Sequence, residues 1–490
     1  MKKHFFILGI LCLTAMLTSC NKEFQQINTN PNNLESPDPG SLLSNILVSE
    51  FYNNVDIAWT LGNGYSQYMT FSQDYYNTGT RYLPVTNEPY WIPMYEAARD
   101  ANLLYNTSLQ QQNPLMEAVA LTLRSYAFAQ LTELWGDIPY TRALQGNTGN
   151  FTPPYDPQQT VYMDPQIGIL ACLRRADSLL KSAPPALLNG DILYQGNATS
   201  WRRFINALRL RYLLRVSSQT NVSAEIQSIV TDGTLMQSAS QSATIVLPPS
   251  LPYNFPSLTE RFGDFQVKYM NSTLYNVFVS TGDSARMVTY FAENSTGVPG
   301  MFSYSYYGGM PMVVNASNAN VISSSNFNSS FRSGDAKVLN ARIMTYAEQE
   351  FDLAEAALKG MIPGSAATYY QDGIIGAYNE IGLTSSQASA YLANPAVALN
   401  LSNPDTALSQ IITQKWLVNI NNAFEGWIEY RRTGYPQFQT GGSVNLNGGV
   451  IPSRFLYPTT EKSINAVNYN KEIQVMGGTE VTTYKAWWEK

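Results

Sequence analysis

Histidine and cysteine are scarce in this chain, which has one histidine and three cysteines among 490 residues. His4 and Cys12 both fall in the first nineteen residues, which we expect to be removed as a secretion signal. The chain that remains would have no imidazole and, besides Cys20, only Cys172. A Ser-His-Asp triad, a Cys-His pair, histidine-ligated zinc and a disulfide framework are thereby excluded. Cys172 lies in an apolar periodic stretch, so we expect it to be buried rather than reactive.

Charged residues are also few, at 13% of the chain. Removing Lys2 and Lys3 with the secretion signal leaves 28 basic against 36 acidic residues, a formal net charge of −8. This balance does not favour nucleic acid as a partner. No Asp-x-Asp-x-Asp-Gly loop is present, so we expect no metal and no cofactor. Abundant Asn, Gln, Ser, Thr and Tyr suit a neutral hydroxylated ligand.

The N-terminal residues have the layout of a lipoprotein signal. Lys2 and Lys3 precede the apolar run 5–13, which is too short to span roughly 30 Å of hydrocarbon. The following residues 17–20, Leu-Thr-Ser-Cys, resemble a lipobox. On that resemblance, residues 1–19 are cleaved and Cys20 becomes a lipidated first residue, held stably by more than one acyl chain. The alternative is an ordinary cysteine in a secreted protein.

Apolar residues recur at helical spacing through most of the chain, which predicts a mainly α fold. In 115–135 they form one apolar face, and Gly136 ends that helix. Gly360 is expected to end the helix at 343–358, and Asn403-Pro404 to start the helix at 404–422. Pairs of helices at roughly 40-residue intervals indicate tetratricopeptide-like repeats, with a plain helical bundle as the alternative. Helices are expected at about 41–58, 89–109, 115–135, 164–182, 199–216, 223–231, 266–279, 343–358, 366–381 and 404–422.

Six dispersed segments carry a resemblance to a known family. They are 27–32 (INTNPN), 134–140 (LWGDIPY), 194–197 with 201–211 (YQGN and WRRFINALRLR), 344–348 with 353–356 (MTYAE and LAEA), 427–436 (WIEYRRTGYP) and 451–458 (IPSRFLYP). In this order they resemble segments of the SusD/RagB family of nutrient-binding outer-membrane lipoproteins, and within it the SusD-like subgroup.

The resemblance implies a single domain over 20–490: an α/α superhelix of four tetratricopeptide-like helix pairs with long irregular insertions. It implies that a loop-rich portion, about 232–338 and 432–470, holds much of the ligand surface. It also implies a SusC-like TonB-dependent transporter as partner, and capture of oligosaccharides, or of peptides in some branches, without catalysis. Residues 21–23 (Asn-Lys-Glu) resemble the signal that sends such lipoproteins to the outer face of the outer membrane.

Two aromatic clusters are the candidate ligand sites. Between Trp59 and Trp91, 27% of residues are aromatic against 12% overall, and aromatic rings stack on the C–H faces of sugar rings. We expect Trp59 and Trp91 to pack in the core. Tyrosines amid Gly, Ser, Asn and Gln are expected on a loop surface instead: Tyr65, Tyr68, Tyr75, Tyr76 and Tyr82.

The second cluster is Phe302 to Gly309, where tyrosines alternate with serines and end in two glycines that would let backbone approach a ligand. Its candidate site residues are Tyr304, Tyr306 and Tyr307. We predict that the two clusters meet to form one ligand site.

Charged side chains near these motifs favour a structural interpretation. Arg431 and Arg432 are expected to pair with helix carboxylates rather than with an anionic ligand. Glu348, Glu350 and Glu355 are expected on a solvated helix face or in internal ion pairs. A glycan hydrolase would need two carboxylates about 5–10 Å apart across the scissile bond, and no local motif singles out such a pair. We expect no catalytic residues.

Overall fold

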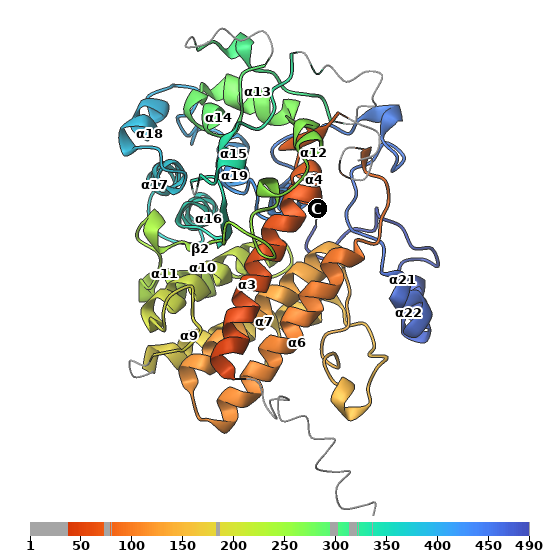
Figure 1. Ribbon diagram of the computed structural model, residues 1–490. Helices are drawn as coiled ribbons and strands as arrows, with labels where there is room; N and C mark the ends of the chain where they lie inside the picture. Colours follow the sequence, from red (N-terminus) through yellow and green to blue (C-terminus); the bar gives the residue numbers. More distant parts are fainter. Residues whose placement is uncertain are drawn as a thin grey trace, which may run out of the picture.

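The computed structural model describes residues 38–72, 79, 81–182, 187–294, 302–312, 321, 323–335 and 337–489. Within these ranges the chain is mainly α-helical, as predicted, with two small antiparallel sheets. Long helices fill the lower part of Figure 1, and shorter helices joined by loops fill the upper part. Cys20, Tyr75 and Tyr76 lie outside the described residues. No helix in the described part is long and apolar enough to cross a bilayer.

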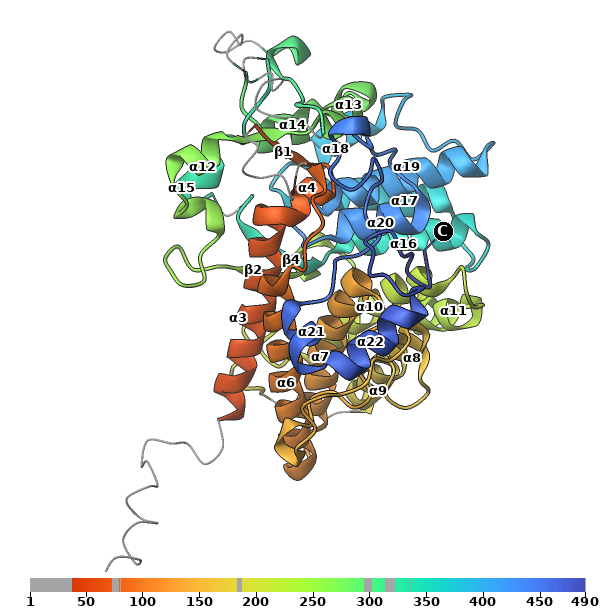
Figure 2. The ribbon, with the colours of Figure 1, turned by 90° about the vertical axis from the view of Figure 1, so that its right-hand side faces the viewer.

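Five long helices form the lower part, and they stand side by side in both views (Figures 1 and 2). They are α3 (Pro39–Ile57), α6 (Glu88–Gln110), α7 (Pro114–Trp135), α9 (Ile169–Ser182) and α10 (Ala198–Val216). Capping side chains start α3, α7 and α10: for example, Asp38 accepts from the Ser41 N–H at 2.8 Å, and Asn113 accepts from the Met116 N–H at 3.0 Å. α6 and α7 pack along each other as a helix pair.

α7 is buried on all sides, so the predicted single apolar face was wrong. From Leu115 to Trp135 every side chain except Arg124 is buried, including polar ones. The cause is its central position, because α6 and α9 pack against it from different sides. Such surroundings cannot be seen in the helix's own periodicity. Gly136 ends α7 with φ of 86°, as expected.

The upper part contains a second group of helices: α16 (Tyr346–Leu358), α17 (Ala366–Glu380), α18 (Ser385–Leu392), α19 (Pro404–Val418) and α20 (Glu425–Thr433). α16 and α17 pair closely. The predicted helix ends are confirmed, because Gly360 follows α16 with φ of 68° and the Asn403 side chain caps α19 in front of Pro404. The two helix groups meet where α10 packs on α16.

Two short antiparallel sheets tie distant segments together. β1 (Met69–Phe71) pairs with β3 (Lys268–Met270), and β2 (Ala243–Val246) pairs with β4 (Asn340–Met344). Both strands β3 and β4 fall where longer helices were expected: α13 starts at Ser272 rather than 266, and α16 at Tyr346 rather than 343. Pairing with a strand about 100 to 200 residues away in sequence decides these boundaries.

Shorter elements complete the chain. The α-helices are α4 (Asn63–Tyr65), α8 (Gln158–Met163), α11 (Ser223–Asp232), α12 (Phe262–Gln266), α13 (Ser272–Thr281), α14 (Ser284–Tyr290), α15 (Ser330–Ser333), α21 (Thr459–Ile464) and α22 (Ala466–Val475). A π-helix, η1 (Ala58–Gly62), joins α3 to α4, and the 3-10 helices are η3 (Gly146–Thr148), η4 (Ala239–Gln241), η5 (Pro256–Leu258), η6 (Tyr304–Tyr306) and η7 (Gly442–Val444).

Candidate ligand-binding site

Three tyrosines of the first cluster lie in the core, so the expectation that they form a loop surface was wrong. Tyr65 and Tyr68 are each 1% exposed and Tyr82 is 0% exposed. Tyr65 packs edge-on against the Trp427 ring at 5.0 Å, and the Tyr68 hydroxyl donates to the Trp416 carbonyl. The polar residues around them do not mark a surface loop.

The physical reason is the path of the backbone. η1 and α4 extend α3 into the interior, and β1 then pairs with β3. The polar neighbours bond within the protein: Gln67 donates from Nε2 to the Tyr82 hydroxyl at 3.0 Å and to the Gln439 carbonyl at 2.7 Å. Trp59 and Trp91, at 1% and 6% exposure, are core residues as predicted.

The second cluster is partly at the surface. Phe302 is 50% exposed, Tyr304 and Tyr306 are half-buried, and Tyr307 is buried. The Tyr275 hydroxyl donates to the Tyr304 carbonyl at 3.2 Å. Tyr304 and Tyr306 therefore still offer part of their rings to a ligand, whereas Tyr307 does not.

The two glycines that end the cluster have a different role from the one expected. A Cβ at Gly308 would lie 1.8 Å from the Ser323 carbonyl oxygen, and one at Gly309 would lie 2.4 Å from the Ser272 Cα. The close approach is therefore to the protein's own backbone, and not to a ligand.

The flanks of the two clusters lie side by side in the structure. The Thr70 hydroxyl donates to the Met310 carbonyl at 3.3 Å, and the Met310 N–H donates to the Met270 carbonyl at 2.8 Å. β1, β3 and the segment around Met310 thus form one framework. That the tyrosines themselves share a ligand stays a prediction, because Tyr75 and Tyr76 lie outside the described residues.

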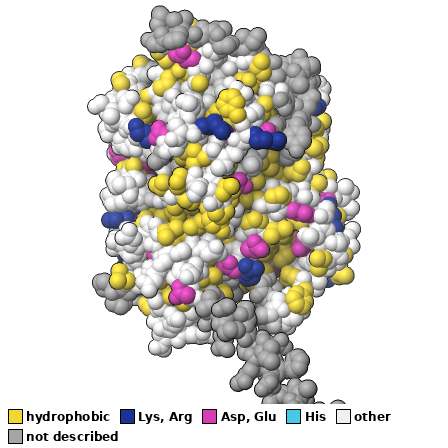
Figure 3. Space-filling model, viewed as in Figure 1, with side chains coloured by type: hydrophobic (Ala, Val, Ile, Leu, Met, Phe, Trp, Pro, Cys, Tyr) yellow, Lys and Arg dark blue, Asp and Glu magenta, His cyan; other side chains and the backbone are white. Residues whose placement is uncertain are grey.

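A cavity of about 420 Å³ opens beside the first cluster, between η1, the end of α3 and the start of α6. Figure 3 shows apolar side chains gathered across the middle of the face that carries α3 and α6. The lining residues are Asn53, Asp56, Ile57, Thr60, Leu61, Phe71, Gly79, Asn87, Pro89 and Tyr90. This volume and this mixture of apolar walls with a few polar groups are typical of small-molecule sites.

The polar groups of this cavity come from two helices. Asn53, Asp56 and Thr60 follow one another on α3 and η1 at helical spacing, and the Thr60 hydroxyl donates to the Asp56 carbonyl at 2.8 Å. Burial raises the pKa of the Asp56 carboxyl. Across the cavity, Asn87 caps α6 in a left-handed conformation, and its buried Nδ2 has no hydrogen-bond partner among the described residues.

Sequence reasoning missed these residues because they lie on helices rather than in an aromatic loop. A signal was present: Asn53, Asp56 and Thr60 place polar groups at the end of an apolar helix, close to the aromatic cluster. Aromatic and prolyl walls suit the C–H face of a sugar ring, while amide, carboxyl and hydroxyl groups suit its hydroxyls. The cavity can therefore accommodate a neutral hydroxylated ligand.

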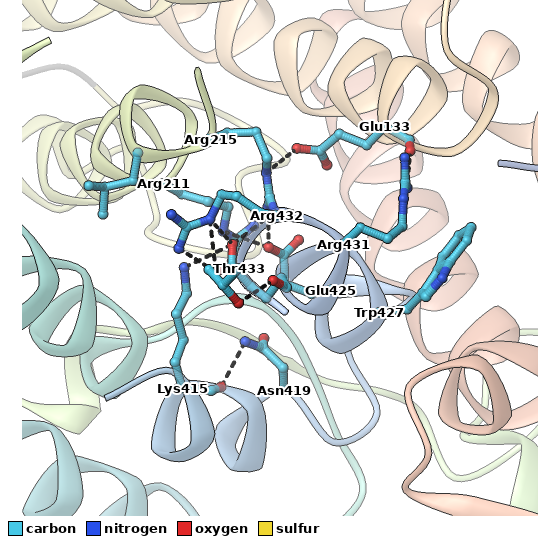
Figure 4. A network of polar contacts seen from close by, with 12 residues as sticks. Glu133, Arg211, Arg215, Lys415, Asn419, Glu425, Trp427, Arg431, Arg432 and Thr433 are labelled. Carbon is cyan, nitrogen blue, oxygen red and sulfur yellow. Dashed lines mark hydrogen bonds and ion pairs between the residues drawn. The ribbon is translucent and has the colours of Figure 1, made fainter. Parts of the chain in front are cut away.

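The arginines and glutamates of the sequence motifs form a buried ionic cluster instead of a ligand site (Figure 4). Arg432 pairs with Glu355 and Glu429 on helices, which confirms its predicted pairing, whereas Arg431 pairs with Glu489, a carboxylate of the C-terminal segment outside any helix. Glu348 pairs with Arg211 at 2.7 Å. Glu350 is buried and accepts from Gln349 at 3.0 Å. Cys172 is buried as expected.

Within the described ranges, no group of three or more His, Cys, Asp or Glu side chains is arranged to hold a metal ion.

Comparison with known proteins gives one family. A model of the SusD-like family, described as starch-binding and associating with the outer membrane, matches residues 31–458. No curated protein matches the chain.

Solved structures resemble the chain over nearly its full length. A SusD homologue from Bacteroides fragilis NCTC 9343 is 28% identical with a TM-score of 0.81, and an outer-membrane protein of Bacteroides vulgatus ATCC 8482, assigned to nutrient binding, is 26% identical with a TM-score of 0.80; each match covers 93% of this chain and 100% of the other. A chitin-binding SusD homologue from Flavobacterium johnsoniae is 21% identical, with a TM-score of 0.74 over 91% of this chain and 98% of the other, and shows the fold alone.

Proposed function

Because this chain belongs to the SusD-like family of starch-binding proteins that associate with the outer membrane, we propose that it captures an oligosaccharide at the cell surface and passes it to a SusC-like TonB-dependent transporter. The observation that carries the proposal is the family match over 31–458. The cavity between α3 and α6 supports it, because its walls suit a sugar ring. We propose no catalytic role for the protein.

The oligosaccharide would bind across the cavity and the exposed part of the second aromatic cluster. This cluster belongs to the loop-rich portion. Phe71 and Tyr90 line the cavity, and Tyr304 and Tyr306 keep part of their rings at the surface. Stacking of a sugar on an aromatic ring tolerates several sugar types. Specificity would come from Asn53, Asp56 and Asn87, whose polar groups are fixed by the surrounding helices.

Calorimetric titration with maltohexaose and with chitohexaose tests this assignment. We expect one of them to bind saturably, and Asp56→Asn and Asn53→Ala each to weaken binding by about tenfold. Gln110→Ala, at the exposed far end of α6 and outside the cavity lining, is the control and should leave affinity unchanged. Unchanged affinity in both cavity variants would reject the cavity. Loss of affinity in Tyr304→Ala and Tyr306→Ala alone would select the second cluster.

Peptide titration, chromatography and co-purification test the other functions that the sequence left open. Peptides that bind while both sugars fail would select the peptide-binding alternative. Shorter sugars found by chromatography after incubation would instead show that the protein is a hydrolase. Co-purification of a TonB-dependent transporter from detergent-solubilised membranes tests the partner, and its absence would contradict the delivery step.

We further propose that Cys20 carries the lipid anchor and that residues 21–23 direct the protein to the outer face. Cys20→Ser should release the protein from the membrane fraction and abolish incorporation of labelled fatty acid. External protease should degrade the wild-type protein on intact cells. Continued membrane association of Cys20→Ser would contradict the anchor.

A further inference from the structure

The cavity between α3 and α6 is small for a whole oligosaccharide. Its volume of about 420 Å³ lies in the lower part of the range of drug-sized ligand pockets, about 300–1,000 Å³. A hexasaccharide is larger than such a ligand, so a chain of sugars that enters this cavity must also contact the surface around it. The face of α3 that borders the cavity leads to such a surface.

Tyr52 lies on α3 directly beside the cavity lining. It precedes Asp56, a lining residue, by one helical turn, so the two side chains are neighbours on the helix surface. Both are half-buried. Burial raises the pKa of Tyr52 to about 12, and the nearby Asp56 and Tyr253 add to the shift. Tyr52 therefore links the cavity to Tyr253, which belongs to a different part of the chain.

Tyr253 lies in the loop between β2 and η5 and packs on Tyr52. The two ring centroids are 5.5 Å apart and the ring planes meet at 74°, which is an edge-to-face contact. Tyr253 is 36% exposed, and its hydroxyl forms no hydrogen bond within the described part of the chain. Leu251 in the same loop is 70% exposed. Figure 2 shows the chain between β2 and α12 projecting beside α3, so this loop offers an aromatic and apolar surface to solvent.

The residues that follow Tyr253 anchor the loop in the core. Phe255 is 1% exposed and packs edge-on against the Trp59 ring, with 5.7 Å between the centroids. Asn254 is also buried, and its Nδ2 donates to the Thr259 hydroxyl at 3.0 Å. Because its neighbours and the Tyr52 ring hold it in place, Tyr253 would lose little conformational freedom when a ligand packs on it.

A single exposed apolar side chain needs no explanation, but Tyr253, Tyr52 and Asp56 form a continuous path from solvent to the cavity. Resting on the function proposed for this cavity, we propose that Tyr253 and Tyr52 form a further sugar subsite. One sugar residue of the oligosaccharide stacks on the exposed part of the Tyr253 ring, while the rest of the chain enters the cavity past Asp56. Stacking on a ring depends on the C–H face that many sugars share, so this subsite adds affinity for longer chains rather than selecting one sugar.

Calorimetric titration with short and long chains of the same sugar tests the subsite. The probes are maltose with maltohexaose, and chitobiose with chitohexaose. In the series that binds, the wild-type protein should bind the six-sugar chain at least tenfold more tightly than the disaccharide. Tyr253→Ala should weaken binding of the six-sugar chain about fivefold and leave the disaccharide unchanged. Tyr484→Ala removes a tyrosine of similar exposure, 40%, outside the cavity lining and should change neither affinity.

Two further variants separate the subsite from the cavity. Tyr253→Phe keeps the ring and should bind the six-sugar chain within about twofold of wild type, whereas Asp56→Asn should weaken binding of both chain lengths. An unchanged six-sugar affinity in Tyr253→Ala, an equal loss for both chain lengths, or an equal loss in Tyr253→Phe would overturn the subsite and leave the cavity standing. If no sugar of either series binds the wild-type protein, the proposed function fails and the subsite with it.

Discussion

Arg432 on α20 and Glu355 on α16 face each other as a two-pronged ion pair, with Nη1 to Oε1 and Nη2 to Oε2 both at 2.7 Å. Both side chains are buried. Burial acts to raise the pKa of Glu355, but Arg432 and Lys359 together lower it to about 2. The pair joins two helices whose sequence motifs lie far apart in the chain, so it fixes their relative position.

Removing one partner should therefore be severe. We expect Arg432→Met to lower the free energy of unfolding by about 3–5 kcal/mol, because buried Glu355 would lose its two-pronged partner and keep only Lys359, and Glu429 would lose one of its cations. Urea unfolding followed by circular dichroism measures the change. Arg99→Met, which breaks the exposed Arg99–Asp100 pair, is the control and should cost less than about 1 kcal/mol. Equal effects in the two variants would contradict a stabilising role for the buried pair.

Glu350 should make the stability of the protein depend on pH. Burial raises its pKa to about 7, above the ordinary value of 4.5. Between these values the folded state holds a proton that the unfolded state releases, so this group's contribution to stability is full below 4.5 and is lost as pH rises through 7.

Glu350→Gln should remove that loss. Between pH 5 and pH 8, the free energy of unfolding of the wild-type protein should fall by about 1–3 kcal/mol more than that of the variant. Urea unfolding at the two pH values measures this difference. Asp405→Asn, an exposed acid, is the control and should follow wild type. A parallel loss in Glu350→Gln and wild type would show that Glu350 does not titrate in this range.

The contact between Gly373 on α17 and Phe351 on α16 yields a third prediction. A Cβ at Gly373 would lie 2.6 Å from the Phe351 ring, so Gly373→Val should overpack the helix crossing and cost about 1–3 kcal/mol. Gly263, with no atom within 4 Å of its Cβ position, supplies the control Gly263→Val. Thermal unfolding compares them, and similar midpoints would contradict close packing at this crossing.

The sequence predicted well what is local in origin. Helix 89–109 is α6 within one residue at each end, and the stops at Gly136 and Gly360 are where they were expected. Both depend on neighbours a few residues away: apolar periodicity sets the helix and a left-handed glycine ends it. The family resemblance added the fold and the class of function, which residue spacing alone left open.

What depends on distant partners could not be predicted. Tyr65 and Tyr68 looked like loop residues because their neighbours are small and polar, yet Trp427 and Trp416, some 350 residues later, enclose them. The cavity beside α6 was missed for the same reason, since Asp56 and Asn87 come together only when the helices pack. Local composition reports polarity, but not which element will cover it.

The C-terminal Trp488 offers a last test of how far the core extends beyond the family match. Its side chain is fully buried between two guanidinium groups, with Arg431 at 4.7 Å and Arg215 at 5.4 Å from the ring. Cation–π contact and loss of a large buried ring act together, so Trp488→Ala should lower the free energy of unfolding by about 3–5 kcal/mol.

Tyr484→Ala, four residues earlier and 40% exposed, should cost less than about 1 kcal/mol. Urea unfolding compares the two variants, and tryptophan fluorescence should report the loss of a buried indole. If Trp488→Ala matches Tyr484→Ala, the C-terminal segment only rests on a core that is complete without it. If it is far less stable, the segment after residue 458 is part of the core.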